Sequence, residues 1–173
     1  MSADRLLLPA DVRETLHERR VAGAPAEVCG VLLGDRAGDA DGDDAAATDR
    51  GSDEAAHTDR GDDDGGGDRT AGDDAPADRV AEAVAVANVA ADADRRYELD
   101  PAETVAVVDD AESRGRDVVG FYHSHPRGPA EPSATDRDRA TWTGYVYAIV
   151  APEDVAAFRW TGESFRPLRV ETP

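Results

Sequence analysis

The segment from Val118 to Asp136, VVGFYHSHPRGPAEPSATD, places the tightest limits on how this chain folds. It begins with an apolar run, Val118 to Tyr122, that is typical of a buried strand and leads into His123, Ser124 and His125. Side chains alternate between the two faces of a strand, so both imidazoles project to one side and the serine to the other. The proline that follows lacks a backbone N–H and ends the strand. The fold must therefore hold a strand that carries two histidines on one face at its end.

A carboxylate follows these histidines at the start of a predicted helix, in the sequence Ser133-Ala134-Thr135-Asp136. Two imidazoles and one carboxylate form the N,N,O ligand set of a catalytic zinc whose fourth tetrahedral position holds water. Two simpler interpretations stay open at this point. The histidines can form a hydrogen-bonded strand end, and Ser133 can simply cap the helix by accepting from the amide three residues on.

The full pattern H-x-H-x7-S-x2-D closely resembles the metal motif of the JAMM (MPN+) metalloprotease family. It is filled here by His123, His125, Ser133 and Asp136. That family also carries an upstream glutamate on a Pro-x-Glu-x-Cys-Gly segment followed by three apolar residues and glycine. Residues 25–34 read PAEVCGVLLG, which matches at each of these positions and places the glutamate at Glu27. The resemblance covers residues 6–34 and 80–173.

This resemblance implies a fold and a set of roles for the five matching residues. The fold is α/β (α+β): a single MPN/JAMM domain with a cytidine-deaminase-like, curved mixed sheet flanked by helices. One zinc ion per chain is expected on His123, His125 and Asp136. The implied reaction uses a zinc-activated water, with Glu27 as the general base that later passes its proton to the leaving amine. Ser133 is expected to donate its hydroxyl to the developing oxyanion.

The implied function is that of a zinc-dependent isopeptidase, a hydrolase of the JAMM type. Its substrates would be small archaeal ubiquitin-like modifier proteins and their lysine conjugates, cleaved at the isopeptide or linear bond after the C-terminal Gly-Gly. The same chemistry serves a second hypothesis, a peptidase that processes a sulfur-carrier protein in sulfur or cofactor metabolism. A third hypothesis, a catalytically silent scaffold of the same fold, is disfavoured because the chain keeps all five functional residues.

Residues 35–78 differ in composition from the rest of the chain. These 44 residues contain 16 acidic residues against 4 arginines, and none is Val, Ile, Leu, Met, Phe, Trp or Tyr. Without apolar surface to bury, a segment cannot offset the roughly 1–2 kcal/mol of backbone entropy lost per ordered residue. We therefore predict an acidic, low-complexity, disordered insertion that divides one domain into residues 1–34 and 79–173. A role of this insertion in repelling or selecting partners is the less favoured alternative.

The overall charge bears on the environment and on the partners of the protein. The formal net charge is −19, and all 19 basic residues are arginine. Such an acid excess suits a halophilic protein, since at molar salt the Debye length falls to about 3 Å and self-repulsion is screened. Nucleic acid is disfavoured as a partner because no basic stripe is available to neutralise phosphates.

Single features of the sequence indicate the compartment. Cys29 is the only cysteine, which excludes an internal disulfide and favours a small buried apolar role. The apolar run before Pro9 is too short for a signal sequence, and no run approaches the roughly 20 residues of a membrane span. We expect a cytoplasmic protein without membrane contact; the motif indicates no particular oligomeric state.

Apolar periodicity and turn residues predict the remaining elements. Helices are expected over residues 10–21, 101–113 and 134–140, with Val12, Leu16, Val21, Val105, Val108 and Ala111 directed inward. Strands are expected over residues 6–8 at a sheet edge, 27–33, around 84–86, 97–99, 118–123, 145–150, 155–160 and 165–170. The last three are expected to form an antiparallel meander, with Pro167 on an edge strand.

Overall fold

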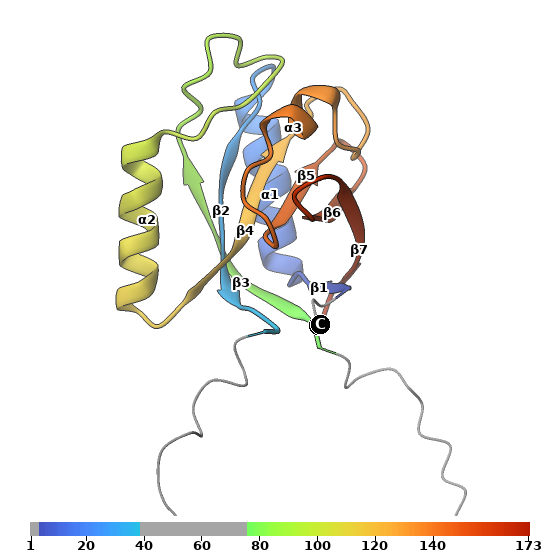
Figure 1. Cartoon of the computed structure of the whole chain (residues 1–173). Helices are drawn as coiled ribbons and strands as arrows, with labels where there is room; N and C mark the ends of the chain where they lie inside the picture. Colours follow the sequence, from blue (N-terminus) through green and yellow to red (C-terminus); the bar gives the residue numbers. More distant parts are fainter. Residues whose placement is uncertain (1–3, 39–75) are drawn as a thin grey trace, which may run out of the picture.

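The computed structural model describes residues 4–38 and 76–173 (Figure 1). The elements follow in the order β1 (Arg5–Leu7), α1 (Ala10–Gly23), β2 (Cys29–Asp35), β3 (Asp78–Val86), α2 (Pro101–Ser113), β4 (Asp117–Ser124), α3 (Ala134–Arg139), β5 (Val146–Val150), β6 (Val155–Trp160) and β7 (Phe165–Glu171).

The strands form one curved sheet that closes into a barrel in the order β1-β3-β2-β4-β5-β6-β7. Strand β1 is parallel to both of its neighbours, and β4 is parallel to β5. The other pairings are antiparallel, including the predicted meander of β5, β6 and β7. A mixed sheet with helices packed against it confirms the α+β fold class expected from the sequence.

Strand β2 is buried on both faces, which explains its unbroken apolar sequence. Leu32 belongs to one hydrophobic cluster, to which α1 contributes Leu16. Its neighbours Val31 and Leu33 point the other way into a second cluster, to which α2 contributes Ala111. Figure 1 shows the two helices on opposite sides of this strand. Burial on both faces opposes slippage of β2 against its neighbours, and its register shifts only locally, between Leu33 and Gly34 toward β3 and between Leu32 and Leu33 toward β4.

Gly30 allows three strands to approach closely near the start of β2. A Cβ at this position would lie 2.0 Å from the carbonyl oxygen of Val84 and 2.5 Å from Cε1 of Tyr122. Both distances are far below van der Waals contact, so any larger residue would force β2 away from its neighbours. The glycine of the Cys-Gly pair therefore serves the packing of the barrel.

Helix α2 begins as the sequence predicts. Asp100 is its N-cap and accepts from the backbone N–H of Glu103 at 2.9 Å, and Pro101 occupies the first helical position. The inward face was assigned wrongly at two positions, because Val105 in α2 and Val21 in α1 are 59% and 64% exposed. The barrel covers only a narrow stripe of each helix, so apolar residues next to that stripe stay in solvent.

The sheet edges differ from the prediction because the barrel closes. Strand β1 is not an edge strand, since it pairs with both β3 and β7. It reaches only Arg169 to Glu171 of β7, so Pro167 lies before this pairing and blocks no hydrogen bond to β1. The strand predicted over residues 97–99 is replaced by an isolated bridge between Asn88 and Leu99.

The prediction of a disordered insertion concerns mainly residues 39–75, which lie outside the described residues. At its two ends the prediction was wrong. Asp35 is the last residue of β2, and Asp78 is the first residue of β3 and only 2% exposed. These two strand ends lie at the end of the barrel opposite α3 (Figure 1).

Within residues 4–38 and 76–173, none of the helices combines the length and the apolar character that a membrane span requires.

Candidate active site

Glu27 is held beside the end of β4 by a pair of hydrogen bonds. The backbone N–H of Val28 donates to Oγ of Ser124 at 2.9 Å, and the N–H of Ser124 donates to the carbonyl oxygen of Val28 at 2.9 Å. Ser124 is fully buried and faces away from the two histidines, as the strand alternation predicts. Its side chain therefore supports the segment that carries Glu27.

The two histidines and Asp136 converge on one point at this end of the barrel. The Nε2 atoms of His123 and His125 lie 3.1 Å apart. Oδ1 of Asp136 lies 3.1 Å from Nε2 of His123, and its Oδ2 lies 3.3 Å from Nε2 of His125. Asp136 reaches this point from α3, whereas His123 lies in β4 and His125 directly follows its last residue.

The size of this triangle fits a metal ion. Zinc binds imidazole nitrogen at about 2.0–2.1 Å, and tetrahedral geometry then separates neighbouring ligand atoms by about 3.3 Å. The separation of the two Nε2 atoms, 3.1 Å, and the distances of 3.1 and 3.3 Å from each of them to the nearer oxygen of the Asp136 carboxylate are close to this value. The two imidazole nitrogens and the carboxylate are largely buried, so water solvates them poorly. A cation bound by all three groups would compensate for the loss of solvation.

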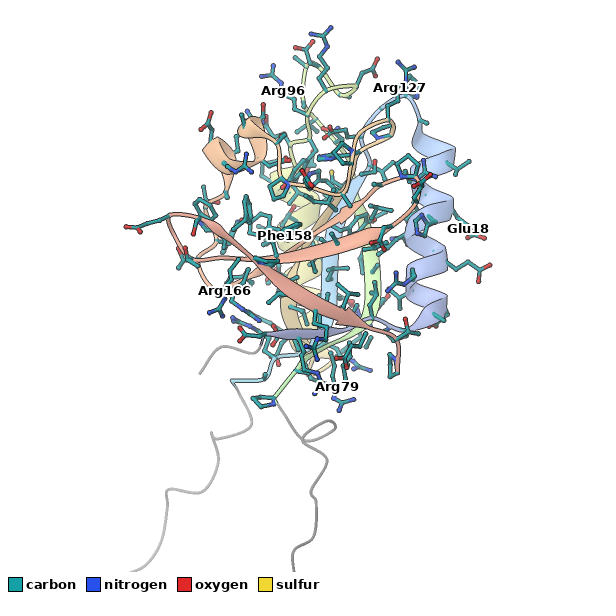
Figure 2. All side chains as sticks on the ribbon, turned by 90° about the vertical axis from the view of Figure 1, so that its right-hand side faces the viewer. Glu18, Arg79, Arg96, Arg127, Phe158 and Arg166 are labelled. Carbon is teal, nitrogen blue, oxygen red and sulfur yellow. The ribbon has the colours of Figure 1, made fainter. Side chains whose placement is uncertain are left out.

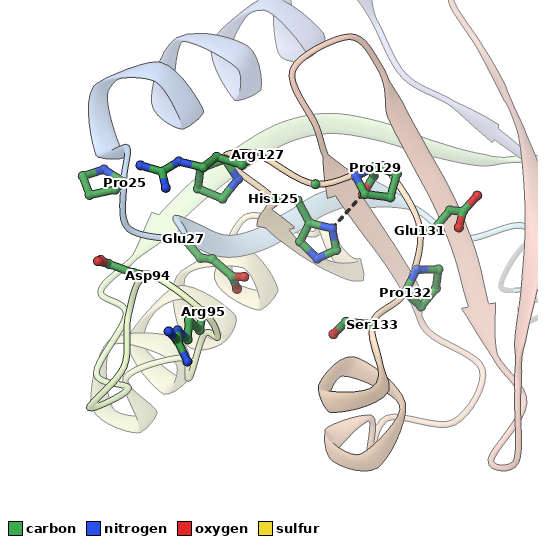
Figure 3. A pocket seen from close by; sticks show the side chains of 12 residues that line it. Pro25, Glu27, Asp94, Arg95, His125, Arg127, Pro129, Glu131, Pro132 and Ser133 are labelled. Atoms are coloured by element: carbon green, nitrogen blue, oxygen red, sulfur yellow. Dashed lines mark hydrogen bonds between the residues drawn. The ribbon is translucent and has the colours of Figure 1, made fainter.

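The two imidazoles are oriented by different contacts. Nδ1 of His125 lies 2.8 Å from the carbonyl oxygen of Pro129, which makes Nδ1 the protonated nitrogen and leaves Nε2 with its lone pair (Figure 3). Nδ1 of His123 is buried and has no hydrogen-bond partner in the described part of the chain. Its ring is instead stacked against Tyr97, with ring centroids 4.2 Å apart and 17° between the planes.

Ser133 and Asp136 form a capping box at the start of α3. The backbone N–H of Asp136 donates to Oγ of Ser133 at 3.1 Å, and the N–H of Ser133 donates to Oδ2 of Asp136 at 2.7 Å. The capping interpretation of this sequence is therefore confirmed, and it also fixes the carboxylate. Because Oγ of Ser133 is the acceptor in the cap, its hydroxyl proton stays available to another group.

Glu27 lies in a cleft of about 500 Å³ that is also lined by His125 and Ser133 (Figure 3). Its side chain is 8% exposed, and Oε2 has no hydrogen-bond partner within residues 4–38 and 76–173. Burial raises the pKa of Glu27 to about 7; His125 opposes this rise and the charge of Asp136 adds to it. A carboxylate with a pKa near neutrality is suited to accept and return a proton.

Electrostatics favour the metal-binding protonation states of Asp136 and His123. Burial lowers the pKa of His123, although Asp136 opposes the effect. Burial alone would lower the pKa of His125 as well, but hydrogen bonds with Asp136 and with the carbonyl of Pro129 outweigh it and raise the pKa. Burial would raise the pKa of Asp136, yet its contacts with both histidines bring it far below the usual range. Asp136 is therefore ionised and His123 neutral at neutral pH, as metal ligands must be.

The structure places all the predicted site residues at one end of the barrel. His123, His125 and Asp136 form one cluster, while Glu27 and Ser133 share the cleft with His125. The sequence did not reveal three further residues in contact with the site: Tyr97, Arg95 and Arg127. Tyr97 and Arg95 come from the connection between β3 and α2, and no local pattern shows that this connection folds over β4.

Comparison with known proteins adds to this geometry. Residues 9–161 match the family described as prokaryotic homologues of the JAB domain. A protein of Haloferax volcanii named desampylase is 41% identical over 175 residues, covering 98% of both chains. A probable TtuB-protein conjugate cleaving protease of Thermus thermophilus is 37% identical over 62 residues, 36% of this chain and 41% of that protein. A solution structure from Desulfitobacterium hafniense shares the fold, with a TM-score of 0.69 at 21% identity, covering 98% of this chain and 93% of the other.

Fold and site together define a hydrolase of the peptidase and isopeptidase class. The chain belongs to the family of prokaryotic JAB-domain homologues.

Proposed function

We propose that this chain is a zinc-dependent isopeptidase that releases small ubiquitin-like modifiers from lysine side chains, cleaving after their C-terminal Gly-Gly. The observation that carries the proposal is the convergence of two imidazole nitrogens and one carboxylate beside a buried, unpaired glutamate oxygen. Two relatives support the substrate class, because one is named desampylase and the other a probable conjugate-cleaving protease. Their names also argue against the hypothesis of a catalytically silent scaffold.

In this proposal His123, His125 and Asp136 hold one zinc ion. A zinc ion in such a site supplies Lewis acidity, which lowers the pKa of water from about 15.7 to about 7. The capping contact from the N–H of Ser133 orients the Asp136 carboxylate toward the histidines. The carbonyl of Pro129 does the same for His125 by fixing its tautomer.

Glu27 acts as the general base and then as the general acid. With a pKa of about 7, it takes a proton from the attacking water and returns it to the leaving amine. Ser133 donates its free hydroxyl proton to the oxyanion that forms at the scissile carbonyl. The two side chains face the same cleft, so the scissile amide is bound with its carbonyl toward Ser133 and its nitrogen toward Glu27 (Figure 3).

The test uses conjugates in which an archaeal ubiquitin-like protein ending in Gly-Gly is joined to a lysine-containing peptide. A panel of such modifiers is incubated at molar salt with wild type, wild type plus a zinc chelator, and Glu27→Gln. We expect wild type to release an intact modifier and both controls to fail. Because the chain contains no lysine, no ε-amine of the enzyme itself can accept the modifier in place of water. A zinc-loaded wild type that leaves every conjugate intact overturns the proposal.

Linear fusions at the same Gly-Gly form a second arm of this experiment. Cleavage of the linear fusion alone would favour the processing of a sulfur-carrier protein over deconjugation. Cleavage of the lysine conjugate, with the linear fusion slower, supports the isopeptidase. The salt range in which activity persists also tests the predicted halophilic character.

A further inference from the structure

Two arginines line the cleft together with Glu27, and neither forms an ion pair within the described residues. Arg95 comes from the connection before α2 and Arg127 from the loop after β4. Both side chains are exposed. Among the nine exposed arginines of the described residues, four form an ion pair and five do not; Arg95 and Arg127 are the two of these five that line the cleft. Their place in the cleft sets Arg95 and Arg127 apart, because there two guanidinium groups without an ion pair are free to bind a carboxylate from outside the chain.

The position of these arginines relates them to one side of the scissile bond. Figure 3 shows Arg95 and Arg127 on the side of Glu27 that faces away from Ser133. If Ser133 meets the carbonyl oxygen and Glu27 the leaving nitrogen, this side receives the leaving group. The leaving group of an isopeptidase is the lysine of the target protein with its flanking residues. This step rests on the proposed function.

We propose that Arg95 and Arg127 bind acidic side chains that flank the modified lysine, so that the enzyme prefers target sites in an acidic sequence context. A guanidinium group binds a carboxylate through two parallel hydrogen bonds, which gives direction as well as charge. Neither arginine forms a hydrogen bond to Glu27. Binding of a target carboxylate to the arginines therefore breaks no contact of the general base.

The preference depends on direct contact because the cleft is not uniformly basic. Asp94 and Glu131 line it as well, and the molecule carries a net charge of −19. An acidic target is therefore repelled over long distances at low salt and gains only where its carboxylates reach Arg95 or Arg127. At molar salt the Debye length is about 3 Å, so the repulsion is screened while contacts at hydrogen-bond distance remain.

The test compares two conjugates of one modifier, linked to peptides in which the lysine is flanked by glutamates or by glutamines. The specificity ratio is kcat/KM for the acidic peptide divided by kcat/KM for the neutral one. We expect a ratio of about 10 or more for wild type and close to 1 for the double variant Arg95→Gln/Arg127→Gln; the ratio of the two peptides within one variant is the readout, so a general change in rate cancels. Arg79→Gln is the matched control, because Arg79 is exposed, forms no ion pair among the described residues and lies at the opposite end of the molecule from Arg127 (Figure 2).

The reversed variant Arg95→Glu/Arg127→Glu sharpens the test and is expected to cleave a lysine-flanked or arginine-flanked peptide better than the acidic one. A wild-type ratio near 1, or a double variant that keeps the wild-type ratio, overturns the inference while the isopeptidase function stands. If wild type cleaves neither conjugate, the proposed function itself fails. Circular dichroism of each variant confirms that the fold is retained before rates are compared.

Discussion

The ring of Tyr97 lies on the imidazole of His123, with ring centroids 4.2 Å apart and only 17° between the planes. This stacking orients a histidine that receives no hydrogen bond at Nδ1 from the described residues, unlike His125 with its contact to Pro129. Outer contacts that orient a metal-binding histidine typically contribute 10–100-fold to affinity. In this chain, stacking against the ring of Tyr97, rather than a hydrogen bond at Nδ1, orients the imidazole of His123.

Replacing Tyr97 should therefore weaken metal binding. We expect Tyr97→Leu to lower zinc affinity by about 10-fold or more, because the imidazole loses its flat support and becomes free to rotate. Tyr97→Phe keeps the ring and should keep the affinity. The measurement is a zinc titration against a competing chelator, together with the visible spectrum of the cobalt-loaded protein. Equal affinities for the leucine and phenylalanine variants would show that the stacking has no orienting role.

The position of Tyr97 against His123 could not be predicted from the sequence. The stretch Tyr97-Glu98-Leu99 has strand-like residues, and a strand was predicted there, but only one bridge forms. The position of Tyr97 against His123 depends on how the connection between β3 and α2 crosses the end of β4. Contacts of this kind join residues 26 positions apart, and no periodicity of the chain records them.

Glu27 should make the metal-free protein less stable as the pH rises. Its folded-state pKa of about 7 lies above the reference value of 4.5, so the folded state binds the proton more tightly than the unfolded state. Stability is therefore greatest below about 4.5 and falls as the pH rises through the folded-state pKa, by about 3 kcal/mol in all. Glu27→Gln removes this titration.

The measurement is the free energy of unfolding by denaturant, with a chelator present, from pH 4.5 to 8. The stability of Glu27→Gln relative to wild type should increase with pH over this range and level off above about 7. Glu18→Gln on the exposed face of α1 controls for the loss of one carboxylate (Figure 2). A difference between Glu27→Gln and wild type that stays constant with pH would contradict the assigned burial cost.

Ser133 has two separable roles in our proposal, a cap for α3 and a donor to the oxyanion. Ser133→Ala should lose about 1 kcal/mol of stability through the cap and about 10²–10³-fold in kcat through the donor. Ser133→Gly loses only a few tenths of a kcal/mol as an N-cap but lacks the hydroxyl equally. Both variants should therefore share the loss of kcat while they differ in stability, and Ser133→Thr should retain most of both. If kcat instead follows stability across the three variants, the hydroxyl is structural only.

Much of the site could be predicted from the sequence because the residues of the His-His-Asp cluster lie close together in the chain. His123 and His125 share a strand face by the period of two, and Asp136 follows at the first turn of α3. Glu27 was placed only through the family resemblance, since its approach to the histidines depends on the pairing of β2 with β4. The closure of the barrel was missed for a related reason. Short strands such as β1 carry too little sequence pattern to show which neighbours they join.

The ion pair between Asp78 and Arg159 is a second long-range contact that was not predicted from the sequence. Asp78 follows an acidic segment rich in aspartate, so its residue type did not distinguish it from that segment. Nη2 of Arg159 lies 2.7 Å from Oδ2 of Asp78, and the side chains are 6% and 3% exposed. Asp78 also accepts from the N–H of Ala37 at 2.8 Å, and Arg159 donates to the carbonyl of Gly144 at 2.8 Å. The pair thereby joins the start of β3 to the end of β6, and its hydrogen bonds reach the residues that follow β2 and precede β5.

Removing one partner of this pair should cost far more than removing an exposed one. We expect Asp78→Ala to lower the free energy of unfolding by about 3–5 kcal/mol, because the guanidinium of Arg159 would remain buried without its countercharge. Glu82→Ala is the control, since it breaks an ion pair to Arg114 whose side chains are 48% and 43% exposed, and we expect it to cost much less because solvent screens the pair. Denaturant unfolding at fixed salt measures both. Equal losses in the two variants would mean that solvent reaches the Asp78 pair, and the buried contact would then not stabilise this end of the barrel.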